Sequence, residues 1–127
     1  MSDVQEIEDL VEEYFRSLYE GDVETIQKIY RPECLLQWTT DEGVKHMAMA
    51  EYLEVVSNRA APRDAGYGPY GQILSIDLSG SEVAVVKVAS AVQPRYFEDY
   101  LTLVKDCEQW KIAAKVYRVV REDTVKT

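Results

Sequence analysis

The chain has 127 residues, of which 46% are hydrophobic and 29% are charged, a composition typical of one globular domain with a single core. Fourteen Lys and Arg residues against 23 Asp and Glu residues give a net charge of −9, which disfavours nucleic acid and anionic membranes as partners. The acidic N-terminus, MSDVQEIEDL, lacks the basic start and apolar run of a signal peptide, and no stretch reaches transmembrane length. We therefore expect one cytoplasmic domain, residues 1–127.

The first half of the chain has helical spacing in three places. Apolar residues recur at steps of three and four from Val4 to Leu18, with a capping box at Ser2 and Gln5 and a terminating glycine at Gly21. The predicted helices are residues 3–20, a short helix between Asp22 and Pro32, and residues 45–59. A strand is predicted at residues 34–40.

The second half has strand patterns. Residues 60–71 hold three Gly, two Pro and two Tyr, which predicts a loop. Four strands follow, with the sequences QILSIDL, EVAVVKVASAV, YFEDYLTLV and WKIAAKVYRVV. Helices followed by an antiparallel meander indicate an α+β fold.

The strand EVAVVKVASAV, residues 82–92, is apolar on both faces. Val83 and Val85 lie on one face, whereas Val86 and Val88 lie on the other. A layer of three helices covers only one side of the sheet. We therefore predict a homodimer formed through the outer face.

This pattern resembles the nuclear transport factor 2-like superfamily, also called SnoaL-like or ketosteroid isomerase-like. The stretch YFRSLYEGDVETIQKIYRPECLLQW resembles the opening of these proteins. The hairpin YFEDYLTLVKDCEQWKIAAKVYRVV is most similar to the branch called putative lumazine-binding. The resemblance implies an NTF2-like cone, with about three N-terminal helices packed on a strongly bent antiparallel sheet. It leaves the activity open, because isomerases, dehydratases, polyketide cyclases and transport adaptors share this fold.

Comparison with ketosteroid isomerase places two of its three functional groups on this chain. That enzyme uses an Asp base and an oxyanion hole made of a Tyr and a protonated Asp. The resemblance places Tyr14 on the oxyanion tyrosine and Asp99 on the oxyanion aspartate. The catalytic base falls on Trp38, whose indole has no basic lone pair.

Asp99 alternates with Phe97, Leu101 and Leu103, so it shares their face of the strand. An inward Asp99 needs a partner, and Tyr14, which lies on the apolar stripe of the first helix, and Lys115 are the candidates. Lys115 lies on the returning strand with Tyr117. If the turn near Cys107 closes an odd number of residues, their face joins that of Asp99. Otherwise Lys115 reaches the rim.

His46 is the single histidine, predicted at the start of the third helix. Scytalone dehydratase, on the same fold, uses a histidine, so His46 is a weak catalytic candidate beside Tyr14 and Asp99, and a solvated histidine is the alternative.

The sequence has no G-x-S-x-G, P-loop, G-x-G-x-x-G or H-E-x-x-H motif, and one histidine cannot build a metal cluster. No cofactor or metal is predicted. Cys34 and Cys107 are expected to be buried or half-buried free thiols.

Three functions remain open. The first is binding of a small, mostly apolar or aromatic ligand in the cone pocket. The second is a cofactor-independent isomerase, dehydratase or cyclase that works by acid-base catalysis. The third is a dimeric interaction module with a filled cone. The expected ligand-binding residues are Tyr14, Trp38, Asp99, Lys115 and Tyr117.

Overall fold

A computed structural model describes residues 2–123 of the chain. The elements in chain order are α1 (Asp3–Glu20), α2 (Val23–Ile29), β1 (Tyr30–Thr40), β2 (Gly43–Ala48), α3 (Met49–Asn58), β3 (Gln72–Ser79), β4 (Val83–Val92), β5 (Arg95–Asp106) and β6 (Gln109–Glu122). None of the described helices is long and apolar enough to cross a membrane.

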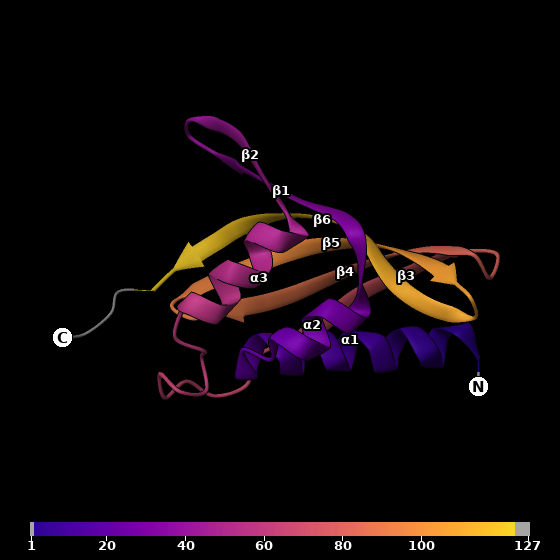
Figure 1. Cartoon of the computed structure of the whole chain (residues 1–127), viewed down its shortest axis with the longest axis horizontal. Helices are drawn as coiled ribbons and strands as arrows, with labels where there is room; N and C mark the ends of the chain where they lie inside the picture. Colours follow the sequence, from indigo (N-terminus) through magenta and orange to yellow (C-terminus); the bar gives the residue numbers. More distant parts are fainter. Residues whose placement is uncertain (1, 124–127) are drawn as a thin grey trace.

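The strands form one open sheet in the order β2-β1-β6-β5-β4-β3, and α1 and α2 lie together along one side of it (Figure 1). Strands β3 to β6 form the predicted antiparallel meander. The sheet is nevertheless mixed, because β1 runs parallel to β6. The predicted antiparallel sheet thus contains one parallel pair, because β1 lies beside the last strand of the chain and runs in the same direction.

Helix α1 has the predicted bounds because both of its ends carry local signals. The Ser2 hydroxyl accepts a hydrogen bond of 3.2 Å from the backbone N–H of Gln5. Gly21 ends the helix with a φ of 68°, a left-handed conformation that costs glycine little. The buried stripe of the helix contains Ile7, Val11, Tyr14, Ser17 and Leu18.

The third helix is shorter than predicted. Residues 43–48 form strand β2, which pairs with β1 across a two-residue turn, and α3 begins only at Met49. Of the apolar residues that predicted this helix, Met49 and Val56 are buried and Leu53 is half-buried. The prediction failed for residues 45–48 because pairing with β1 overrides their local helical preference.

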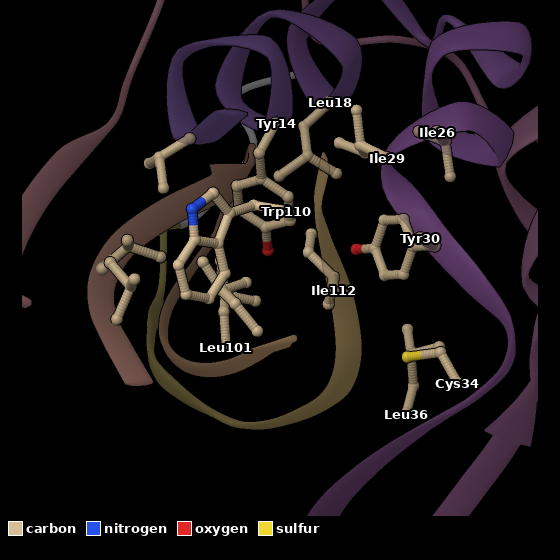
Figure 2. Packing of buried hydrophobic residues seen from close by; sticks show 14 of the residues in the cluster. Tyr14, Leu18, Ile26, Ile29, Tyr30, Cys34, Leu36, Leu101, Trp110 and Ile112 are labelled. Atoms are coloured by element: carbon tan, nitrogen blue, oxygen red, sulfur yellow. The ribbon is translucent and has the colours of Figure 1, made fainter. Parts of the chain in front are cut away.

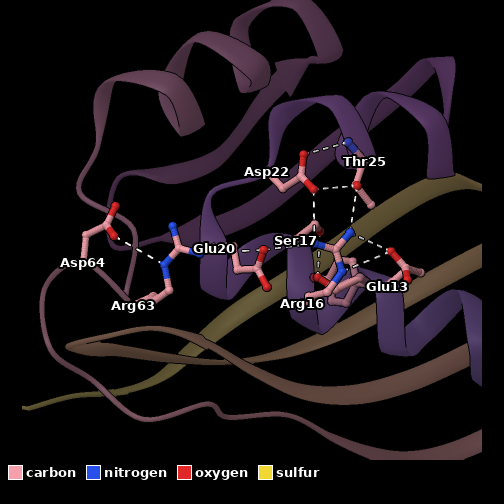
Figure 3. A network of polar contacts seen from close by, with 9 residues as sticks. Glu13, Arg16, Ser17, Glu20, Asp22, Thr25, Arg63 and Asp64 are labelled. Atoms are coloured by element: carbon pink, nitrogen blue, oxygen red, sulfur yellow. Dashed lines mark hydrogen bonds and ion pairs between the residues drawn. The ribbon is translucent and has the colours of Figure 1, made fainter.

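An ion-pair network joins α1 and α2 at their connecting turn (Figure 3). Arg16 contacts carboxylate oxygens of Glu13, Glu20 and Asp22 at 2.7, 3.0 and 3.2 Å, respectively. It also donates to the Thr25 hydroxyl at 2.9 Å. These contacts connect the last turns of α1 to the start of α2.

The core lies between the helices and the inner face of the sheet. Figure 2 shows the rings of Tyr14 and Tyr30 inside it, with their hydroxyl groups directed among apolar side chains. Trp110 is also buried, and its indole N–H donates to Asp3 at the start of α1. Polar groups in this core require internal partners, because water does not reach them.

The β5–β6 turn is unusual in sequence. Cys107 and Glu108, its two central residues, have φ values of 48° and 67°. Two consecutive left-handed residues are typical of a type I′ hairpin turn, which favours Asn and Gly.

Cys34 is buried as predicted, and burial raises the pKa of its thiol to about 11. Cys107 is exposed at the turn, so its predicted burial is wrong.

Candidate functional site

Asp99 lies on the inner face of β5 and is fully buried. Its Oδ2 atom accepts a hydrogen bond of 2.5 Å from the Tyr14 hydroxyl and one of 2.6 Å from the Ser90 hydroxyl. Its Oδ1 atom is buried and has no hydrogen-bond partner among residues 2–123. The carboxyl group therefore has one satisfied oxygen and one oxygen that remains available to a donor.

Strand alternation and sheet register bring these groups together. Asp99 is opposite Val88 on β4 and Tyr117 on β6, and Ser90 is two residues beyond Val88 on the same face. Tyr14 reaches Asp99 from the buried stripe of α1. The prediction that Asp99 faces inward and pairs with Tyr14 is confirmed.

Tyr14 and Tyr30 resist ionisation. Burial raises the pKa of Tyr14 well above its ordinary value, and the nearby Asp99 carboxylate raises it further. Burial likewise raises the pKa of Tyr30, whose hydroxyl has no hydrogen-bond partner within residues 2–123. Tyr14 is therefore a hydrogen-bond donor at neutral pH.

Lys115 also lies on the inner face, opposite Leu101 on β5. The turn closes two residues, so the stated condition of an odd number is not met, and the register shift between Thr102 and Leu103 brings Lys115 to the face of Asp99 instead. Its side chain is buried, at 6% exposure, and no carboxylate within residues 2–123 comes within 4.0 Å of its nitrogen. Of the two candidate partners of Asp99, Lys115 therefore forms no ion pair with it. Instead, Nζ lies 5.0, 5.5 and 5.2 Å from the ring centres of Tyr14, Tyr52 and Tyr117, respectively. Three aromatic faces thus stabilise the positive charge of the ammonium group.

A small cavity of about 40 Å³ lies between the end of α3 and the inner face of the sheet. Its lining residues are Leu18, Tyr52, Arg59, Ser90, Val92, Phe97, Lys115 and Tyr117. By volume it holds roughly three water molecules, at about 10–15 Å³ each. A larger ligand would enter only if side chains at its edge moved.

An aromatic cluster borders the cavity. Trp38 on β1 stacks on Tyr117, with ring centres 5.5 Å apart and an interplanar angle of 19°. Phe97 meets the same tyrosine edge-on at 5.4 Å. Burial raises the pKa of Tyr117 to about 12. Trp38 itself does not line the cavity, but it supports a ring that does.

His46 lies away from this cluster. It is exposed on edge strand β2, opposite Gln37, rather than at the start of a helix. The structure therefore brings Tyr14, Asp99, Lys115 and Tyr117 together and leaves His46 outside.

Three residues of the site were missed by sequence reasoning. Ser90 has the signal that identified Asp99, because it is polar in the buried alternation of β4. Tyr52 has a signal too, since it shares helical spacing with Met49 and Val56. Arg59 has none, because it follows α3 at the start of a loop.

The arrangement differs from an isomerase-type oxyanion hole. Such a site needs two donors aimed at the ligand. Here the Tyr14 hydroxyl donates to Asp99, and Trp38 supplies no base. Within residues 2–123, no group of three or more His, Cys, Asp and Glu side chains is placed to hold a metal ion. The arrangement can instead accept a hydrogen bond and contact a ligand with cationic and aromatic groups.

Comparison with solved structures defines the class of fold. An NTF2-like protein of unknown function from Silicibacter pomeroyi DSS-3 is 23% identical, with a TM-score of 0.81 over 91% of this chain and 94% of that protein. A ketosteroid isomerase-like protein from Erwinia carotovora atroseptica SCRI1043 is 16% identical, with a TM-score of 0.69 over 91% and 94%. The CaMKII hub of S. rosetta is 15% identical, with a TM-score of 0.65 over 91% and 95%. The protein has an NTF2-like α+β fold.

The sequence identifies the family within this fold. Residues 2–118 match the family described as "Putative lumazine-binding", and the chain belongs to that family. No curated protein matches the chain.

Proposed function

We propose that the protein binds a small organic ligand at the inner face of the sheet, with the polar end of the ligand in the cavity beside Ser90 and Lys115. The observation that supports this proposal most is the unpartnered polarity of the site. Lys115 and Arg59 both line the cavity, yet Lys115 pairs with no carboxylate within residues 2–123 and the buried Nη2 atom of Arg59 has no hydrogen-bond partner there. Buried polar groups left without partners cost free energy, which a bound ligand would offset.

The aromatic residues give the ligand a second kind of contact. Phe97 and Tyr117 line the cavity, and Trp38 stacks behind Tyr117. Apolar and aromatic walls with a few convergent polar groups are typical of sites for small molecules. Lumazine is a candidate through the family description alone.

Tryptophan fluorescence tests this proposal. The fluorescence emission of Trp38 is sensitive to changes at Tyr117, on which its ring stacks. Trp110 lies in the core beside Asp3, so the titration is made in a Trp110→Phe background to remove its emission. The panel contains pteridines, flavins and aromatic carboxylates. We expect at least one compound to give a saturable change in Trp38 emission, and a Trp38→Phe variant that retains Trp110 is the control. Absence of a saturable change across the panel would contradict the proposal.

A second candidate is a dimeric interaction module, favoured by the small volume of the cavity and by the outer face of the sheet. Large apolar residues are exposed there on four adjacent strands: Leu35, Val83, Val85, Tyr100 and Val116. Lys87, Glu98 and Arg118 give the surrounding surface charges of both signs, so this face carries cations that would offset the repulsion between two acidic chains. We propose a second copy of the chain as the occupant of this face.

An acid-base enzyme is less well supported. Its oxyanion donor, Tyr14, is already bonded to Asp99, and no base stands at Trp38.

A further inference from the structure

We infer that the ligand carries a carboxylate, and that this group is held between the ammonium group of Lys115 and the guanidinium group of Arg59. This inference rests on the proposed binding function and adds the chemical class of the ligand.

The first observation is the environment of Lys115. Its side chain is more than nine-tenths buried and lines the cavity, while three tyrosine rings occupy the positions where an acidic partner would normally lie. Aromatic faces stabilise a cation but accept no strong hydrogen bond from it. The ammonium group therefore keeps its capacity for a charge-assisted hydrogen bond to an anion.

Arg59 supplies the second cation. It follows the C-terminal end of α3, lines the same cavity, and lies 6.0 Å from the ring centre of Tyr52, over which Lys115 also lies. Its Nη2 atom is buried and has no hydrogen-bond partner within residues 2–123. A guanidinium nitrogen without an acceptor, on a cavity that a lysine without a carboxylate partner also lines, marks a place for an anion.

The charges fit one carboxylate. The cavity is lined by two cations, Lys115 and Arg59, and Asp99 lies behind Ser90, to which it is hydrogen-bonded. Two positive charges and one negative charge leave one positive charge for the ligand to neutralise. A monoanion fits this balance, whereas a phosphate monoester brings up to two negative charges.

The volume of the cavity also accommodates a carboxylate group. A cavity of about 40 Å³ has room for a carboxylate, whose three heavy atoms replace roughly three water molecules. The rest of the ligand would contact the apolar lining, Leu18, Val92 and Phe97, once side chains at the edge of the cavity had moved to admit it. The inferred ligand is therefore an apolar or aromatic monocarboxylate.

Benzoate and benzamide test the inference as a matched pair, because they have the same shape and differ in charge. Binding is measured from chemical-shift changes of the backbone amides of Ser90, Lys115 and Tyr117. We expect benzoate to bind at least about tenfold more tightly than benzamide, and added salt to reduce that difference.

Lys115→Met and Arg59→Met remove the charges while keeping much of the side-chain length. Each is expected to weaken benzoate binding by about tenfold or more and to leave benzamide binding nearly unchanged. Lys87→Met and Arg63→Met are the controls, since Lys87 packs on Tyr100 and Arg63 pairs with Asp64, and neither lines the cavity. If Lys115→Met does not fold, Arg59→Met gives the same test at a partly exposed position.

The outcomes separate this inference from the proposed function. Equal binding of benzoate and benzamide at these amides, or unchanged benzoate affinity in the folded charge-removing variants, would overturn the carboxylate inference and leave a binding site. If neither probe binds and no compound of the fluorescence panel binds, the inference fails together with the binding function.

Discussion

The hydroxyl of Tyr14 donates a hydrogen bond of 2.5 Å to Oδ2 of Asp99, and so connects α1 to β5 across 85 positions of sequence. Ser90 donates to the same oxygen from β4. This three-residue cluster holds the first helix on the inner face of the sheet. Because it is buried, each member depends on the others for hydrogen bonding.

Tyr14→Phe is expected to lower the free energy of unfolding by about 1–3 kcal/mol, because it removes one of the two donors to a buried carboxylate. Urea denaturation followed by circular dichroism measures this change. Tyr70→Phe is the control, since Tyr70 is exposed, and is expected to change stability by less than about 0.5 kcal/mol. Equal effects of the two substitutions would contradict a stabilising role for the Tyr14 bond. Combining Tyr14→Phe with Ser90→Ala should give a non-additive effect, since both residues bond the same atom.

Asp99→Asn is expected to destabilise the protein by about 1–3 kcal/mol. The amide oxygen can still accept from Tyr14 and Ser90, but these bonds become neutral, and the amide nitrogen takes the position of the unpartnered Oδ1. Thermal unfolding gives the change. Asp77→Asn, at an exposed position on β3, is the matched control and should have little effect. A more stable Asp99→Asn variant would mean that the buried charge costs more than its two hydrogen bonds contribute.

Stability should fall above about pH 10. Burial raises the pKa of Tyr14, Tyr30 and Tyr117, and that of Tyr117 reaches about 12. A phenol whose folded pKa lies above its unfolded value of about 10 stabilises the fold fully below that pH. This contribution is lost as the pH rises toward the folded pKa.

Absorbance at 295 nm during an alkaline titration tests this expectation. Of the nine tyrosines, Tyr14, Tyr30 and Tyr117 should ionise only at higher pH or on unfolding. Tyr14→Phe should reduce the late fraction and leave the early fraction unchanged. Ionisation of all nine tyrosines near pH 10, while the circular dichroism spectrum remains that of the folded protein, would contradict this expectation.

Val85→Glu should convert a homodimer into a monomer. Val85 is 38% exposed in the apolar part of the outer face, where a second copy would bury the new charge without a partner. Sedimentation equilibrium should give twice the chain mass of 14.5 kDa for the unchanged protein and the single mass for the variant. Val4→Glu, at a similarly exposed position on α1, should remain dimeric. A mass of 14.5 kDa for the unchanged protein at all concentrations would rule out the dimer.

Glu108→Gly should raise the free energy of unfolding by about 0.5–1 kcal/mol. Glu108 has a φ of 67°, which an L-residue adopts at a cost and glycine adopts freely. Glu42→Gly, in the exposed β1–β2 turn, is the matched control. Glu42 is not in a left-handed conformation, so glycine there should lower stability by up to about 1 kcal/mol. Chemical denaturation of both variants gives the comparison, and a destabilised Glu108→Gly protein would contradict the turn assignment.

Much of the fold was predictable because its signals are local. Ser2 and Gly21 lie at the two ends of α1, and both cap it as predicted. In β5, the alternation of Asp99 with Leu101 and Leu103 predicted an inward carboxylate, and all three side chains are buried. Helix periodicity and strand alternation depend on neighbours within a few residues, so the sequence records them directly.

Residues 45–48 show where local signals fail. Their spacing favoured a helix, yet pairing with β1 makes them a strand and leaves His46 exposed on it. The hydrogen bonds of a strand come from another segment, and no local pattern identifies that segment.

By itself, the sequence determined which side chains face the core: Tyr14 through the stripe of α1, and Asp99 through the alternation of β5. Tertiary structure alone decided what they meet there. It placed Lys115 among three tyrosine rings instead of against Asp99, brought Arg59 to the same cavity, and set β1 parallel to β6. The physical reason is that the direction in which a side chain points depends on the geometry of its own helix or strand. The distances between side chains of different elements depend on strand order, register and helix docking together.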